Sequence, residues 1–171
     1  MLDSPDMKVI AAVLLFAAGA FAQKIDMQFD QGVDFSKFKT FAIREGVLNS
    51  KNPALNGELI RKRINADIEK YLSARGLEFA GSGKTDLNVR YTLGAARKAE
   101  VEAYPARWWG TRLVRVPYTE GTLVINLRDP KTQSLVWRAI AQEEKDNATQ
   151  VEAKLDDMVK KSFEKYPPKP K

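Results

Sequence analysis

The chain contains no cysteine and no histidine. Without cysteine, a disulfide and a lipid anchor on an N-terminal cysteine are both excluded. Without histidine, catalytic groups of the Ser-His-Asp and Cys-His types cannot form, because both need an imidazole base. Zinc and other transition metals are bound mainly by histidine and cysteine, so we expect no metal site and no cofactor. Carboxylate chemistry and oxygen-bound calcium stay open.

Long hydrophobic runs are also missing beyond the first residues. The apolar segment after Met7-Lys8 ends in Ala20-Phe21-Ala22. A charged start, an apolar middle and a small-x-small end are typical of a secretory signal peptide, and the segment falls short of the roughly 20 residues of a membrane span. We therefore predict a signal peptide over residues 1–22, with Met7 as the true start and cleavage after Ala22. The alternative is an uncleaved leader that anchors the chain to the inner membrane.

The remaining chain is basic, with 28 Lys and Arg against 22 Asp and Glu in the whole sequence. Its length fits one domain over residues 23–166, followed by a tail rich in proline and lysine at 167–171. In the periplasm or outside the cell, a basic protein meets anionic polymers, lipid headgroups and envelope proteins. Charge alone would also suit a cytoplasmic nucleic-acid binder, but export excludes that partner.

Two segments have the periodicity of amphipathic helices. In the first, Ile60, Ile64, Ile68 and Leu72 recur every four residues, which predicts one buried stripe. Asn56 is the expected N-terminal cap and Gly76 the expected left-handed end of this helix. In the second, Thr149 and Glu152 suggest a capping box. Its apolar stripe consists of Val151, Leu155, Met158, Val159 and Phe163.

Alternating apolar and polar residues predict strands near residues 25–30, 87–93, 118–128 and 134–141. Residues 34–43, with their aromatic side chains, predict a loop that leads into another strand. Asp129-Pro130 favours a turn that joins the last two strands into a hairpin. Residues 97–117 show no clear pattern, and we expect a loop there. The sequence predicts a single α+β domain: a mainly antiparallel sheet of five or six strands with two helices on one face, in the order β-β-α-β-β-β(-β)-α.

Several motifs together resemble the bacterial envelope family called domain of unknown function DUF4136. They are Asp34-Phe35-Ser36-Lys37-Phe38-Lys39-Thr40-Phe41, Tyr118-Thr119-Glu120-Gly121-Thr122-Leu123, Asp129-Pro130-Lys131-Thr132, Leu135-Val136-Trp137-Arg138 and Tyr166-Pro167-Pro168. The resemblance implies export, often as a lipoprotein, and brings no established activity or catalytic residue. The chain departs from the family by lacking the lipidated cysteine, which favours a protein without a lipid anchor. It also places Gln133 where the turn favours glycine.

One aromatic and basic segment is the leading candidate for ligand or partner binding. Its residues are Tyr104, Arg107, Trp108, Trp109, Arg112 and Arg115. Aromatic rings stack on sugars or lie at membrane interfaces, and guanidinium groups pair with phosphate and carboxylate. The segment therefore suits an anionic envelope polymer, a lipid headgroup or a partner protein. The alternative is that Trp108 or Trp109 packs beneath the sheet edge as core.

A second candidate surface follows from strand alternation. With the apolar residues turned to the helices, the other face of the sheet presents Arg90, Arg128 and Arg138. Val124, Val136 and Ile140 are expected on the same face. A mixed cationic and apolar surface of this kind can dock a partner. The alternative is that the segment 97–117 covers it.

Two other patterns point to catalysis or nucleotide binding less directly. Gly81-Ser82-Gly83-Lys84-Thr85 resembles part of a phosphate-binding loop, but Glu78 replaces the first glycine and a strand follows, so we predict a turn. Carboxylates occur at Glu100/Glu102, Glu120, Glu143/Glu144 and Asp156/Asp157. A glycosidase needs two of them about 5–10 Å apart in a cleft. The sequence thus favours a non-enzymatic binding or structural protein of the envelope, with a carboxylate-dependent hydrolase of envelope glycans as the alternative.

Overall fold

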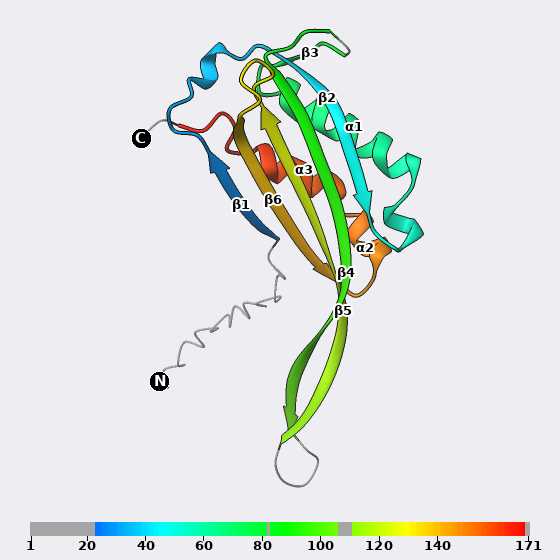
Figure 1. Ribbon diagram of the computed structural model, residues 1–171. Coiled ribbons are helices and arrows are strands. Elements are labelled where there is room, and N and C mark those ends of the chain that lie inside the picture. The colour runs from blue at the N-terminus through cyan, green and yellow to red at the C-terminus, as the bar shows by residue number, and fades with distance from the viewer. Residues whose placement is uncertain (1–22, 82, 106–110, 170–171) are drawn as a thin grey trace, which may run out of the picture.

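The computed structural model describes residues 23–81, 83–105 and 111–169. Six strands of this described part form one sheet, and the helices lie together on one face of it (Figure 1). The strands are β1 (Lys24–Phe29), β2 (Thr40–Asn49), β3 (Glu78–Phe79), β4 (Leu87–Pro105), β5 (Thr111–Arg128) and β6 (Leu135–Lys145). The helices are α1 (Glu58–Ser73), α2 (Ala148–Glu152) and α3 (Leu155–Phe163), with short 3-10 turns η1 (Phe35–Lys37) and η2 (Pro53–Leu55). The predicted α+β class and element order are confirmed.

The strands lie in the order β1-β6-β5-β4-β2-β3. Antiparallel pairing joins β1 to β6, β6 to β5 and β5 to β4, whereas β2 pairs in parallel with both β4 and β3. Parallel neighbours need a crossover connection, and α1 supplies it between β2 and β4. The first strand of the chain therefore lies at one edge of the sheet, and it is hydrogen-bonded to the last.

The core lies between this sheet and the helices. Ile64, Ile68 and Leu72 of α1 are fully buried and Ile60 nearly so, which confirms the predicted stripe. The residues that face them alternate along the two central strands: Leu87, Val89, Tyr91 and Leu93 on β4, and Leu123, Ile125 and Leu127 on β5. Burying a side chain of this kind stabilises the fold by about 1.5–3 kcal/mol before the loss of entropy is subtracted.

Two glycines allow side chains to lie directly on the sheet. A Cβ atom built on Gly46 would lie 2.2 Å from Cζ of Tyr91. A Cβ atom on Gly121 would lie 2.3 Å from Cγ1 of Val151, so α2 sits against the bare backbone of β5. No larger residue fits either position without moving its neighbour.

The helix ends differ from the sequence expectations. The cap of α1 is Gly57, which has no side-chain bond. Asn56 lies one residue before the cap, and its side-chain Nδ2 donates to the Ser50 carbonyl oxygen (2.8 Å). The cap of α2 is Asn147, whose Oδ1 accepts from the Gln150 amide at 3.0 Å, so the predicted capping box is wrong. The single closing helix is divided at residues 153–154, where the Lys154 amide donates to the Val151 carbonyl oxygen (3.0 Å).

Two predicted turn positions are confirmed. Gly76 has a φ of +89°, which ends α1 in the left-handed region. Gln133 has a φ of 60°, and it therefore adopts the conformation that glycine would take more readily in the turn between β5 and β6. The predicted turn at 81–85 also connects β3 to a strand, not to a helix.

The predicted loop at 97–117 is wrong. The pairing of β4 with β5 continues without a register shift from Ala95↔Gly121 to Pro105↔Thr111. β2 ends at Asn49, opposite Gly94, and β6 ends at Lys145, opposite Thr119. Beyond these points β4 and β5 continue as a two-stranded ribbon that leaves the body of the sheet (Figure 1). We call this ribbon, residues 95–105 and 111–118, the arm.

Among the residues that the structure describes, no helix has the length and apolar character needed to cross a membrane.

Candidate functional site

The arm exposes apolar side chains to solvent. Val101 is 55% exposed and Leu113 69% exposed. Val101 lies opposite Arg115, which is also exposed, and the next pair on the same face is Ala103 with Leu113. No other strand of the described chain pairs with the arm. The arm therefore combines apolar and cationic groups on a projecting ribbon, as a contact surface requires.

The predicted binding residues fall on this arm or next to it. Tyr104 pairs with Arg112 near the end of the ribbon, but the structure describes only their backbone. Arg115 is described in full and is exposed. Arg107, Trp108 and Trp109 lie outside the described residues, so the choice between a binding role and core packing for the tryptophans stays a prediction.

The second predicted surface is the face of the sheet opposite the helices, which we call the open face. Arg90, Asn126 and Arg138 lie side by side there on β4, β5 and β6. Arg138 Nε donates to Asn126 Oδ1 at 2.7 Å, and Arg90 Nε lies 3.6 Å from Glu45 Oε2. Arg128 donates to the Gln133 carbonyl oxygen at 2.8 Å. The three arginines thus share the face as predicted, and each is held by a local partner.

The apolar part of the open face is smaller than expected. Val124 and Ile140 are half-buried on it, but Val136 is only 2% exposed. Leu127 pairs with Trp137 whereas Arg128 pairs with Leu135, so Val136 is the extra residue of a bulge and the simple alternation fails there. The described part of the arm extends away from the sheet and does not cover this face, contrary to the alternative (Figure 1).

A carboxylate pair lies between α1 and α3. The Tyr71 hydroxyl donates to Asp156, at 2.9 Å from Oδ1 and 3.0 Å from Oδ2, and Lys70 Nζ lies 3.3 Å from Oδ1. Burial opposes the ionisation of Asp156, but Tyr71 and Lys70 outweigh it and hold its pKa below the usual value. Burial, with the nearby charge of Asp156, raises the pKa of Asp67 to about 6. Oδ2 of Asp67 is buried and accepts no hydrogen bond from the described residues.

The sequence suggested Asp156 only as a neighbour of Asp157, and its pairing with Asp67 was not predicted. No local pattern could reveal the pair, since Asp156 comes from a helix that is distant in sequence. The other predicted carboxylates are engaged separately. Glu143 is buried and lies 2.7 Å from Lys145 Nζ, Glu120 binds Lys98, and Asp157 lies 3.3 Å from Lys161. Glu100 and Glu102 are described by backbone alone.

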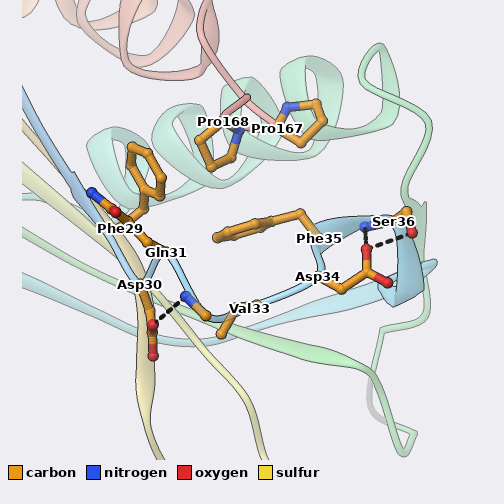
Figure 2. Close-up of a pocket in the computed structure, with 10 residues that line it drawn as sticks. Phe29, Asp30, Gln31, Val33, Asp34, Phe35, Ser36, Pro167 and Pro168 are labelled. Atoms are coloured by element: carbon orange, nitrogen blue, oxygen red, sulfur yellow. Dashed lines mark hydrogen bonds between the residues drawn. The ribbon is translucent and has the colours of Figure 1, made fainter. Parts of the chain in front are cut away.

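A hollow of about 480 Å³ lies where the segment after β1 meets the C-terminal tail. Figure 2 shows Phe29, Phe35 and Pro168 turned toward one another around it. The two nearby carboxylates bind their own loop: Asp30 Oδ1 accepts from the Gly32 amide at 2.9 Å, and Asp34 Oδ1 accepts from the Ser36 amide at 3.1 Å. The Ser36 bonds also lower the pKa of Asp34. Both carboxylates therefore stabilise the conformation of the loop that follows β1.

A second hollow, of about 760 Å³, lies at the base of the arm. It is lined by the segment that follows β2, by the first arm residues and by the start of α2, including Ser50, Lys51, Arg97 and Asp146. No cluster of acidic side chains in the described part of the chain has the arrangement of a metal site.

The exposed side chains of the arm and the two hollows are features suited to contact with another molecule.

Comparison with known structures finds chains of similar fold. The chain is similar to a PDZ domain protein from Parabacteroides distasonis, with a TM-score of 0.58, 19% identity and coverage of 85% of this chain and 35% of that one. It thus spans about a third of that protein, and the likeness concerns the fold. Similarity extends to the PelC dodecamer from Paraburkholderia phytofirmans (TM-score 0.48, 8% identity, 83% and 95% coverage). A minor lipoprotein from Acinetobacter baumannii gives a TM-score of 0.33, 12% identity, and 75% and 91% coverage.

No curated protein matches the sequence. A family description does match, and it covers residues 25–168, which is nearly all of the described chain. The motifs that suggested this family lie at positions the fold needs: Trp137 in the core, Gly121 beneath α2, and Asp129 at the β5–β6 turn. The chain belongs to the family described as Domain of unknown function (DUF4136).

Proposed function

We propose that this protein is exported to the bacterial cell envelope and acts there as a non-enzymatic binding module. The ligand class is an anionic envelope polymer, a lipid headgroup or a partner protein. One observation carries the proposal: the arm extends from the sheet with Val101, Leu113 and Arg115 exposed. Exposed apolar and guanidinium groups on one projecting ribbon suit an anionic partner with apolar parts.

The charge of the chain supports the same partner class. The sequence carries a net charge of +6 and an isoelectric point near 9.5. A positive field concentrates anionic ligands near the surface before contact forms. The carboxylate-dependent hydrolase stays an untested prediction.

Binding is tested by cosedimentation of the protein with peptidoglycan, with lipopolysaccharide, and with vesicles of anionic phospholipid. The variant L113S/R115E removes one exposed apolar group and reverses one charge on the arm. It should bind at least tenfold more weakly. The matched control L59S/K160E makes the same two changes on helices, where Leu59 is 79% exposed and Lys160 is also exposed. If both variants bind equally well, the arm is not the binding surface and the proposal is contradicted.

Export is tested separately by expressing the full chain in bacteria and separating the cell fractions. We expect the protein in the periplasm or the medium, with Gln23 as its first residue in the mass spectrum. A chain found in the cytoplasm with residues 1–22 intact would contradict export. A chain that keeps this leader in the inner membrane would support the uncleaved anchor instead.

A further inference from the structure

Within the described residues, the outer edge of β4 has no partner strand along the arm. β2 stops at Asn49, opposite Gly94, and no described strand continues beside residues 95–105. Alternate residues of such an edge direct backbone N–H and C=O groups outward. The unpaired stretch is roughly 35 Å long at about 3.4 Å per residue. An isolated two-stranded ribbon is only marginally stable in water, so this edge is suited to pair with a further strand.

The two edges of the arm are not equivalent. The β5 edge carries Pro117, which has no N–H to donate and blocks regular pairing at that point. The β4 edge has no proline from Ala95 to Tyr104. The β4 edge is therefore the one able to accept another strand.

The order of charges on this edge makes it complementary to itself. Arg97 and Lys98 precede Ala99, and Glu100 and Glu102 follow it. If a second copy pairs antiparallel with Ala99 opposite Ala99, Lys98 of each copy stands opposite Glu100 of the other. Cross-strand pairs of opposite charge stabilise a sheet, and the small alanines allow close approach at the centre.

The end of the second arm would lie next to the body of the protein, at the base of the first arm. In this register Ala103 of the second copy stands opposite Ala95, just before the position that β2 occupies. Its chain must then leave the plane of the sheet beside Asn49. The hollow at the base of the arm, lined by Asn49, Ser50, Lys51 and Ala95, lies at this place.

We propose that two copies of this chain associate through their β4 edges, antiparallel about Ala99, and so join two arms into one four-stranded ribbon. The arrangement has a two-fold axis and is closed, so it yields a dimer and no larger ring. It goes beyond the proposed binding function and does not depend on it.

The absence of native cysteine gives a direct test. In full-length A99C the only two thiols of a dimer lie on directly opposite residues, whose Cα atoms are about 4.5–5.5 Å apart in an antiparallel pair. That separation falls within the range that a disulfide bridges. We expect rapid dimer formation under mild oxidation at micromolar concentration. The control is A80C, because Ala80 is exposed but follows β3 and lies outside the arm. This variant should stay monomeric.

Charge reversal tests the register. Lys98 also binds Glu120 of its own chain, just outside the arm, so the charge of Glu120 must be reversed together with that of Lys98. E100K places like charges opposite each other twice in the dimer, and the dissociation constant from sedimentation should rise about tenfold. Reversal of all three charges in K98E/E100K/E120K should return the dissociation constant to the value of the parent chain.

A monomeric parent chain in sedimentation, or an A99C variant that cross-links no faster than A80C, would overturn the proposal. So would a triple variant no better than E100K alone, or larger assemblies in place of dimers. None of these results changes the outcome of the cosedimentation test with L113S/R115E. Failure of the dimer proposal and failure of the binding proposal can therefore be told apart.

Discussion

Gly121 is the position where the structure predicts the sharpest effect of a single methyl group. The Cβ atom of G121A would lie 2.3 Å from Cγ1 of Val151, whereas carbon atoms prefer about 3.5–4.0 Å. Val151 is fully buried on α2, so it must move by more than an ångström. Overpacking of this kind costs about 1–3 kcal/mol of the free energy of unfolding. For a domain of this size the midpoint of thermal unfolding should fall by about 3–10 °C.

The measurement is urea unfolding followed by the fluorescence of tryptophan, because Trp137 is fully buried in the native state. The variant V151A leaves a cavity and should itself destabilise the fold by about 2 kcal/mol. In G121A/V151A the new methyl group occupies that space. The loss in the double variant should therefore be smaller than the sum of the single losses by about 1–2 kcal/mol.

The matched control is G94A. A Cβ atom on Gly94 meets only the Asn49 carbonyl oxygen, at 3.9 Å, so its effect should stay within about 0.5 kcal/mol. If G121A is as neutral as G94A, or if the losses of G121A and V151A simply add, then α2 does not rest on the bare backbone of β5 and the reasoning is refuted.

Two further predictions concern pH. The pKa of Asp67 is raised from 3.8 to about 6, so folding favours the protonated form of this carboxyl. Its contribution to the free energy of unfolding is full below pH 3.8 and is lost as the pH rises through 6. D67N should thus be more stable than the parent at pH 7.5, and the gap should close below pH 4; a constant gap in urea unfolding across this range would contradict it. Asp86 behaves oppositely, because bonds from the Lys39 and Thr40 amides hold its pKa below 3.8. D86N should lose about 1 kcal/mol at neutral pH, and this loss should vanish as the pH falls below 3.8; a loss that persists in acid would exclude the carboxylate as its cause.

The parts of the fold that could be predicted from the sequence depend on neighbours close in the chain. The stripe of Ile64, Ile68 and Leu72 is visible because one face of α1 is buried along its whole length. The turn at Asp129 was also predictable, since Asp129 Oδ1 accepts from the Lys131 amide two residues away. In both cases a window of a few residues contains the cause.

The arm and the carboxylate pair could not be found in this way. A ribbon exposed on both faces needs no alternation of apolar and polar residues, so the strands through Val101 and Leu113 leave no periodic signal. Asp67 acquires its raised pKa from burial in the assembled fold and from the charge of Asp156, which is remote in sequence. Asn56 is not the cap of α1, which begins one residue later than expected, and its side-chain Nδ2 donates to the Ser50 carbonyl oxygen in the preceding segment. Each of these features depends on contacts that form only in the assembled fold, so a local stretch of sequence does not contain its cause.

The pairing of β1 with β6 also sets the order in which the molecule can be completed. Lys24 lies opposite Gln142 and Phe29 opposite Trp137, so the first strand cannot find its place until the last one exists. Closing so long a loop costs an entropy on the order of 4 kcal/mol, whereas β4, β5 and β6 meet through shorter connections. A chain delivered from its N-terminus would therefore carry β1 unpaired through most of its synthesis or transport. Docking of β1 therefore cannot precede the arrival of β6, which lies more than 100 residues later in the chain.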